Sequence, residues 1–380
     1  MKRGLAGRFE VTACQGEQVR AFVPSPLPPS PGIEMTASRR RLLEEADAAL
    51  AKLDGAAFHL PEIDLFLYAY VRKEAVLSSQ IEGTQSTLSD LMLFELDDLQ
   101  VPIDDVKEVS SYVAAMEHGM VRLKDMPLSG RLIREMHEKL MAKGRGSEKE
   151  PGEFRRSQNW IKGQRPSQAH YVPPPPHEVL PCMGDLDKFI NAQDGMPTLV
   201  RAALAHVQFE SIHPFLDGNG RIGRLIIALL LQQSGKLSRP LLYLSLYLKA
   251  NKTEYYRLLD KVRAEGDWEA WIDFFLKGVA ETAHSASLTA RKLADCYQQD
   301  LAKIQKLGRS GGKAAGALSC FRKRPILDIK GVAASINVTF PTATKAIMTL
   351  VANGILSEKT GKARNRVFVY RRYIEVLNSD

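Results

Sequence analysis

The chain has 380 residues, a formal net charge of +8, and apolar and charged fractions of 44% and 25%. This length allows two or three domains with separate cores, and the composition excludes a disordered or fibrous chain. The longest apolar run, residues 225–231, is far too short to span a bilayer, and the N-terminus lacks the apolar stretch of an export signal. Four scattered cysteines without a CxxC pair indicate reduced thiols, and suggest neither a zinc site nor a cysteine nucleophile. We therefore expect a cytoplasmic protein that does not enter a membrane.

The positive charge is concentrated at the end of the chain. Residues 311–380 hold 12 Lys and Arg against 4 Asp and Glu, whereas the first 310 residues hold 40 of each sign. A basic excess on a small folded unit favours an anionic partner such as nucleic acid, although a solvated basic surface without a partner explains it equally well. The charge predicts a neutral body followed by a basic terminal domain.

The first half of the chain is predicted to be mainly helical. Residues 1–34 look irregular, with a proline-rich run near their end. Apolar residues at helical spacing then predict helices over about 36–53, 62–80, 87–99, 106–124 and 129–142. The segment 151–176 has few helix formers, a central Gly163 and four closing prolines, and therefore predicts a small β-hairpin, the only sheet-like part of the body.

The second half is predicted to end in a separate module. Helices are expected over about 177–193, 199–212, 222–233, 252–266 and 267–307, and the glycine-rich run 308–313 predicts a linker. In the tail, 330–338 and 339–354 predict two short helices, and 355–370 predicts two strands around a basic turn. This order resembles a winged helix-turn-helix.

Such a tail has two alternative roles. If it binds DNA, its second helix would offer Thr342, Thr344 and Lys345 to the bases. Basic side chains of the wing would then meet phosphates, namely Lys359, Lys362, Arg364 and Arg366. A module of this size can equally mediate contact with another protein, and the sequence leaves both roles open.

Twelve residues, HPFLDGNGRIGR from His213 to Arg224, combine residue types that suit chemistry on a nucleoside triphosphate. Gly218 and Gly220 let successive backbone N–H groups face one anion, and a helix beginning near Arg221 would add its positive end. Arg221 and Arg224, at spacing i, i+3, share a helix face and can fork onto phosphate oxygens.

Two further residues complete this pattern. Asp217 is a hard oxygen ligand that suits Mg²⁺, and His213 is a natural general base at neutral pH. The plain alternative is a polar loop between two core helices. Against it, all twelve positions resemble the signature of the Fic family, HPFx(D/E)GNGRxxR, in which the residue matching Phe215 packs beneath the loop.

The resemblance implies a mainly α fold, a Fic helical bundle with a small β-hairpin flap, and transfer of AMP from ATP to a protein hydroxyl. It implies that His213 is the catalytic base and that Asp217 holds Mg²⁺. It further implies ATP binding by the residues that follow, namely Gly218, Asn219, Gly220, Arg221, Ile222, Gly223 and Arg224.

A second motif, SSQIEG, resembles the (S/T)xxxE(G/N) pattern of Fic proteins that inhibit themselves. It places Ser78, Glu82 and Gly83 at the end of an expected helix. The resemblance implies that Glu82 takes a bidentate hydrogen bond from Arg224, the guanidinium that should hold the γ-phosphate. The same glutamate serves AMP removal in some relatives. A mere helix end, with Ser78 and Glu82 one turn apart, is the alternative.

Two more segments resemble parts of the family site. The predicted hairpin resembles the flap that holds the target as an added strand, through Gln168, Ala169, His170, Tyr171, Val172 and Pro173. An ordinary surface hairpin is the alternative. Tyr255 and Tyr256 resemble an aromatic pair that lines the adenine pocket, although two adjacent tyrosines on a helix usually mean one packed and one exposed. The asparagine that binds adenine in some relatives is absent, and Val262-Arg263-Ala264 stands near its place.

We therefore expect a self-inhibited protein adenylyltransferase, a nucleotidyltransferase acting on Ser, Thr or Tyr, with Mg²⁺ as cofactor and ATP as co-substrate. The expected divisions are 1–34, irregular; 35–112, inhibitory helical region; 113–285, Fic core; 286–312, linker helix; and 313–380, winged helix-turn-helix. The alternatives are a Fic phosphotransferase and a DNA-binding regulator whose Fic body senses nucleotide. Besides a target protein, DNA and a second copy of the chain are candidate partners.

Overall fold

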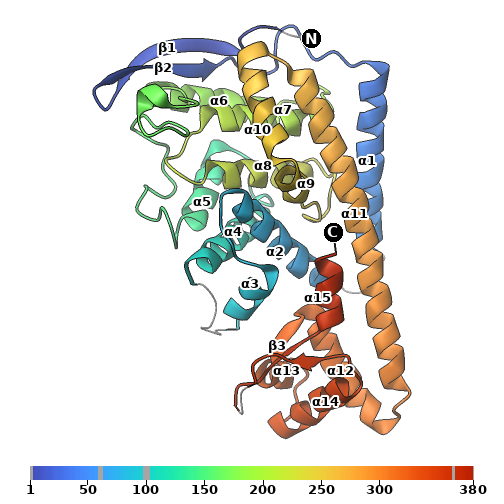
Figure 1. The fold of residues 1–380 in the computed structure, drawn as a ribbon. Helices are drawn as coiled ribbons and strands as arrows, with labels where there is room; N and C mark the ends of the chain where they lie inside the picture. Colours follow the sequence, from blue (N-terminus) through green and yellow to red (C-terminus); the bar gives the residue numbers. More distant parts are fainter. Residues whose placement is uncertain (1–2, 59–62, 97–102, 362–363, 380) are drawn as a thin grey trace.

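The computed structural model describes residues 3–58, 63–96, 103–361 and 364–379. The expected helix start at 62, the end of the helix expected at 87–99, and Lys362 lie outside these residues. The described residues are mainly helical, as predicted (Figure 1). The body contains α1 (Ala37–Phe58), α2 (Ile63–Ile81), α3 (Leu88–Phe94), α4 (Ile103–Arg122), α5 (Gly130–Leu140), α6 (Pro176–Asn191), α7 (Thr198–Ile212), α8 (Asn219–Gln233), α9 (Ser245–Ala250), α10 (Lys252–Glu265) and α11 (Trp268–Gln305).

Helices α7 and α8 form the centre of the body. Every residue from Leu199 to Ile212 is buried, and most of α8 is buried as well, because α6, α10 and α11 cover α7 while α4, α5 and α2 cover α8. A helix that is apolar around most of its circumference belongs in such a core. The loop between these two helices is therefore anchored at both ends in the buried core.

The N-terminal segment is not irregular, which corrects the sequence prediction. It forms an antiparallel hairpin, β1 (Gly7–Cys14) and β2 (Glu17–Pro24), which extends over α6 in Figure 1. Gln15 and Gly16 turn the chain with φ values of 51° and 81°. Positive φ at both residues is what a tight two-residue hairpin requires, and the glycine accepts it readily.

The hairpin predicted over 151–176 is much reduced. A single bridge joins Ile161 and Tyr171, and a 3₁₀ turn, η1 (Pro166–Gln168), lies between them. Proline cannot donate to a strand ladder, so Pro166 and the prolines from Pro173 onward limit the pairing. The flap is thus a loop with one bridge, and the larger hairpin of the body is β1–β2.

The glycine-rich run 308–313 is largely helical and not an irregular linker. Helix α11 runs through 285–286, as the helix expected over 267–307 requires, and α12 (Arg309–Lys323) begins within the glycine-rich run. A Cβ on Gly311 would lie 2.3 Å from the carbonyl oxygen of Ile304. At this position a glycine permits close packing between the two helices.

The C-terminal part contains α12, β3 (Ile326–Asp328), α13 (Ile329–Ser335), α14 (Phe340–Ala352), β4 (Ser357–Glu358), β5 (Val367–Val369) and α15 (Arg371–Leu377), with the strands in the order β3-β5-β4. Two helices are thus followed by two strands, in the predicted order; the assignment as a winged helix-turn-helix stays a prediction. This part also contacts the body, because Lys73 Nζ on α2 donates to the carbonyl of Leu377 at 2.7 Å. Among the described helices, none has both the length and the apolarity to cross a membrane.

Candidate active site

The segment from His213 to Arg224 makes a sharp turn between α7 and α8. His213 ends α7 in the left-handed region with φ 48°, and Gly218 precedes α8 with φ 77°. Helix α8 begins at Asn219, two residues earlier than expected. The N–H groups of its first turn therefore face the loop, where a helix end attracts an anion.

Phe215 lies fully buried beneath this turn, in the position the family pattern implies. Its ring stacks on His137 of α5, with centroids 3.7 Å apart. The side chain of Asn219 bonds the backbone of Phe215. Its amide nitrogen donates to the Phe215 carbonyl at 2.8 Å, and its amide oxygen accepts from the Phe215 N–H at 2.9 Å. The side chain of Asn219 is thus occupied with the loop, so only its backbone N–H is left for a phosphate.

Hydrogen bonds fix the backbone of His213, while Nδ1 of its ring has no hydrogen-bond partner among the described residues. Its carbonyl accepts from Arg155 Nε at 2.9 Å, and its N–H donates to Phe209. Burial, reinforced by the positive charges of Arg155 and Arg263, lowers the pKa of the imidazole to about 3. A neutral imidazole at physiological pH is the protonation state that a general base requires.

Glu82 reaches across from the end of α2 to the start of α8. Its Oε1 accepts from Arg224 Nη2 at 2.7 Å, and Arg224 also donates to Ser78 through Nε and Nη2. The contact joins the two predicted motifs. It is not bidentate, because only Nη2 of Arg224 donates to Glu82, while Nε donates to Ser78. Burial alone would lower the pKa of Arg224, yet the negative charge of Glu82 raises it well above its ordinary value.

The carboxylate of Glu82 also covers the glycine turn. A Cβ on Gly220 would lie only 2.3 Å from Glu82 Oε1, so the carboxylate rests on the glycine backbone. Gly83 ends the motif with φ 105°, a conformation that glycine adopts without strain. The site holds a carboxylate where the loop geometry favours an anion.

Arg221 is placed differently from the prediction. It is 1% exposed, and its Nη1 donates to Glu108 of α4 at 3.2 Å, whereas Arg224 faces α2. The two arginines therefore do not converge on one ligand in this structure. Ile222 is fully buried in the core, so its side chain is not at the nucleotide site.

Asp217 lies within the turn itself, directly before Gly218. Its Oδ1 accepts from the Gly218 N–H at 2.6 Å, and its Oδ2 lies 3.4 Å from Lys149 Nζ. Its side chain is 27% exposed. An accessible carboxylate beside a phosphate loop is chemically suited to Mg²⁺.

Tyr255 and Tyr256 lie beside each other on α10, with ring centroids 4.9 Å apart. Tyr255 is buried, and its hydroxyl lies 2.8 Å from His206 Nε2, while Tyr256 is partly exposed. Burial raises the pKa of both tyrosine hydroxyls. The ring of His206 would lie 3.2 Å from a Cβ on Gly223, so this histidine connects Tyr255 to α8 one residue before Arg224.

The predicted flap residues are in part already engaged. Tyr171 is buried and donates from its hydroxyl to the Ser211 carbonyl at 2.6 Å, and His170 lies 2.8 Å from Asp260. The Val172 carbonyl accepts from the Phe22 N–H at 2.8 Å. Strand β2 therefore occupies the backbone edge of the flap at Val172, where an added target strand was expected. Gln168, Ala169 and Pro173 flank these residues.

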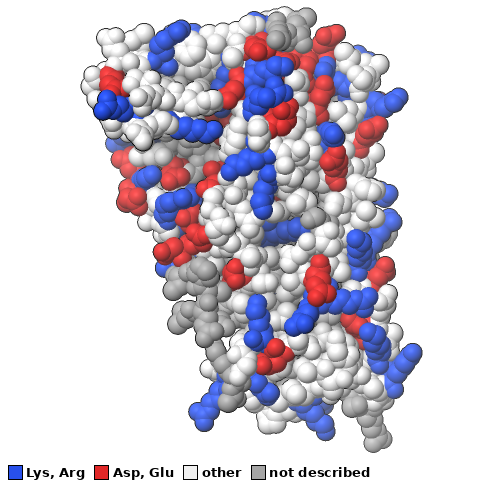
Figure 2. Space-filling model, in the orientation of Figure 1, with Lys and Arg blue, Asp and Glu red and all other residues white. Residues whose placement is uncertain are grey.

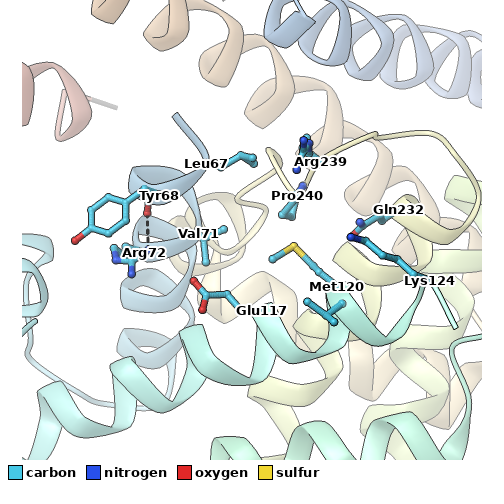
Figure 3. A pocket seen from close by; sticks show the side chains of 11 residues that line it. Leu67, Tyr68, Val71, Arg72, Glu117, Met120, Lys124, Gln232, Arg239 and Pro240 are labelled. Carbon is cyan, nitrogen blue, oxygen red and sulfur yellow. Dashed lines mark hydrogen bonds between the residues drawn. The ribbon is translucent and has the colours of Figure 1, made fainter. Parts of the chain in front are cut away.

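A pocket of about 470 Å³ elsewhere in the body does not belong to this site. It lies between α2, α4 and the segment after α8, and its lining includes Arg72, Met120 and Arg239 (Figure 3). None of the residues that line it is among the sequence-predicted site residues. The candidate active site is thus defined by converging side chains around the α7–α8 turn.

Sequence patterns did not identify the buried polar residues that surround the turn: Glu74, Glu108, Tyr112 and His137 on other helices, Glu210 on α7, and Arg155 in the loop after α5. Each lies outside a recognisable motif or, for Glu210, just before one. For the helical ones the signal is a polar side chain at a position whose helical neighbours are apolar, which identifies burial but not a partner.

The comparisons with known proteins agree with this geometry. Residues 40–121 match the Fic/DOC family N-terminal domain and residues 127–231 match the Fic/DOC family domain. Protein adenylyltransferase Fic of Drosophila ananassae is 31% identical over 175 residues, which cover 45% of this chain and 32% of that relative. The Drosophila erecta protein of the same name is 30% identical over 216 residues, covering 56% and 40%.

Solved structures show the same fold. A Fic family protein from Desulfovibrio desulfuricans G20 superposes with a TM-score of 0.59 at 19% identity, over 89% of this chain and 97% of that one. A Fic domain containing signaling protein from Bacteroides thetaiotaomicron gives 0.52 at 20% identity, over 67% and 97%. The fold and the loop agree with the two regions of the Fic/DOC family that this chain carries, at residues 40–121 and 127–231. It spans about a third to two fifths of the length of the fly relatives.

Proposed function

We propose that this chain is a protein adenylyltransferase that is inhibited by its own Glu82. The observation that carries the proposal is the arrangement at the turn: the Glu82 carboxylate rests on Gly220 and accepts from Arg224, beside the His213 ring, whose Nδ1 has no hydrogen-bond partner among the described residues. The relatives named protein adenylyltransferase support it.

In this reaction the ring of His213 accepts the proton of a Ser, Thr or Tyr hydroxyl on the target. That oxygen forms a bond to the α-phosphorus of ATP, the bond to the β-phosphate oxygen breaks, and pyrophosphate leaves. The N–H groups of Gly218 to Gly220 and the guanidinium of Arg224, once Glu82 withdraws, stabilise the negative charge. In the reverse direction Glu82 would orient the water that removes AMP.

The proposal assigns Mg²⁺ to Asp217. This carboxylate is partly exposed, with Lys149 Nζ 3.4 Å from its Oδ2 and Arg221 Nη2 3.7 Å from its Oδ1, and its oxygens fit a hard cation that also takes phosphate oxygens. Bound there, the metal would supply positive charge to the phosphates.

Incubation with ATP labelled in turn at its α- and γ-phosphates tests the reaction. We expect α-label on a protein, this chain included, and none from the γ-position. Transfer of γ-label would indicate a phosphotransferase, the alternative chemistry of this fold. No label from either position, with tight DNA binding, would favour a nucleotide-sensing regulator.

A separate proposal concerns the C-terminal part as a DNA-binding module in the cytoplasm. Lysines and arginines are spread over this end on the face shown in Figure 2, and Lys345, Lys359 and Arg364 are exposed. However, Phe340 and Met348 are also exposed on α14, which suits contact with a protein. Binding of the full chain to duplex DNA should weaken steeply with salt, and its absence at low salt would favour protein contact.

A further inference from the structure

Arg155 stands out as a buried cation to which the proposed reaction assigns no role. It lies in the loop after α5 and is 2% exposed. Burial lowers the pKa of its guanidinium to about 10, which still leaves the side chain positively charged at neutral pH. Among the described residues, only main-chain carbonyls and no carboxylate accept hydrogen bonds from it. A buried charge without an ion partner is costly, so the contacts that Arg155 makes instead indicate its role.

Three of these contacts hold the start of the α7–α8 turn. Nε donates to the carbonyl of His213 at 2.9 Å, and Nη2 lies 3.4 Å from the carbonyl of Ile212, the last residue of α7. The backbone N–H of Arg155 donates to the carbonyl of Pro214 at 2.9 Å. Three successive residues are therefore held by one residue from a different part of the chain.

The main chain of His213 needs such support. It lies in the left-handed region with φ 48°, which few residues other than glycine adopt. A conformation of this kind persists only where the surrounding structure fixes it. Because the imidazole is carried by this main chain, the contacts of Arg155 help to determine where the proposed base lies.

The same guanidinium also holds the end of the flap. Nη2 donates to the carbonyl of Pro174 at 2.5 Å, directly after the flap residues 168–173. Tyr171 of the flap makes a second link to this region, since its hydroxyl donates to the carbonyl of Ser211 at 2.6 Å. Arg155 thus joins the segment expected to border the target protein to the residue expected to accept the target's proton.

We propose that Arg155 is a positioning residue, which fixes the main chain of His213 relative to the flap so that the imidazole meets the hydroxyl of the target. It acts through His213, and the groups assigned to phosphate lie on the other side of the turn, at the start of α8. A displacement of about 1 Å in a reacting group can cost about 100-fold in rate. The inference rests on the proposed function and adds to it a residue that no motif identified.

Self-modification of the full chain with ATP labelled at the α-phosphate tests this, in the Glu82→Gly background that should release inhibition. Arg155→Lys keeps the charge and loses the fork. Arg155→Gln keeps two N–H donors and brings no charge into the core, so its folding is the less at risk. Both should lower the single-turnover rate about 10- to 100-fold, with equilibrium ATP affinity within about twofold of that of the Glu82→Gly protein.

A second background separates positioning from a general effect on the fold. When His213→Ala is also present, the same replacements of Arg155 should lower the residual rate by less than about twofold, because no imidazole is left to position. Gln158→Ala is the matched control. It removes a hydrogen bond of 2.9 Å from the same loop to the carbonyl of Pro173 and leaves the turn untouched, so the rate should not change.

Three results would overturn the inference while leaving the proposed function intact. The first is that folded Arg155→Lys or Arg155→Gln protein keeps more than half of the rate. The second is an equal loss of rate with and without His213, and the third is a parallel loss of ATP binding. Thermal melting identifies which variants fold, and if Arg155→Lys does not, Arg155→Gln decides. Absence of transfer in the Glu82→Gly protein itself would contradict the proposed function, and this inference with it.

Discussion

Oε1 of Glu82 lies 2.7 Å from Nη2 of Arg224, across 142 residues of sequence. The same oxygen rests on Gly220, in the turn that would receive phosphate. One carboxylate thus both neutralises the arginine and fills the anion position. Competition between this carboxylate and the nucleotide follows from charge alone.

Glu82→Gly should therefore raise AMP transfer at least tenfold. Hydrogen bonds to charged groups contribute roughly 1.5–3 kcal/mol, and about 1.4 kcal/mol corresponds to one decade in rate. Adding Arg224→Ala should abolish the gain, since the arginine that Glu82 releases is then missing. Transfer rates of the two single variants and the double variant provide the measurement.

Ser78→Ala is the matched control for this prediction, because it removes one hydrogen bond of Arg224 and leaves Glu82 in place. Its gain should be smaller than that of Glu82→Gly. If Glu82 only ended a helix, its replacement would lower the melting temperature without activation.

His213→Ala should reduce transfer at least about a hundredfold, the lower range for loss of a positioned base. ATP affinity should change little, because the phosphate-binding groups lie on α8. Single-turnover rates and equilibrium ATP binding separate the two effects. A variant that keeps more than half of the activity would show that another group takes the proton.

His213 should also shape the pH dependence of stability. Its folded pKa, about 3, lies below the ordinary value of 6.5, so between these values the unfolded chain binds more protons than the folded one. This histidine therefore destabilises the fold progressively as pH falls from about 6.5 toward 3. His213→Ala should lose less stability than the unmodified protein over that range in thermal melts at successive pH values. Parallel curves would contradict a depressed pKa.

Features encoded by contiguous residues or by a motif could be predicted from the sequence, and contacts between isolated residues of different helices could not. The α7–α8 turn was predictable because its residues are contiguous, and the pairing of Glu82 with Arg224 because both belong to motifs. The hairpin β1–β2 was missed although Gln15-Gly16 lies between two segments of strand-forming residues. The partner of Arg221 could not be predicted, since Glu108 comes from another helix with nothing in its neighbourhood to single it out.

Glu108→Ala should destabilise the fold by about 3 kcal/mol, because it removes the nearer carboxylate from the buried charge of Arg221 and leaves only Asp217, 3.7 Å away and partly exposed. The double replacement Glu108→Leu with Arg221→Leu should recover much of that loss. Denaturant unfolding of Glu108→Ala, Arg221→Leu and the double variant measures this. If instead Arg221→Leu left stability unchanged and weakened ATP binding strongly, the arginine would serve phosphate, as the motif first suggested.

The last prediction concerns the contact between the C-terminal part and the inhibitory helix. Lys73 lies on α2, nine residues before Glu82, which directly follows the end of this helix. It is 7% exposed and donates to the carbonyl of Leu377. Lys73→Met removes this hydrogen bond while keeping an apolar chain of similar length. Because α2 is then held less firmly, Glu82 should leave Arg224 more often, and transfer should rise a few-fold with a lower melting temperature. Arg372→Gln, which loosens α15 from Gln299 on α11 instead, should leave transfer unchanged. A Lys73→Met protein with a lower melting temperature and unaltered transfer would show that the C-terminal part packs on α2 without influencing Glu82.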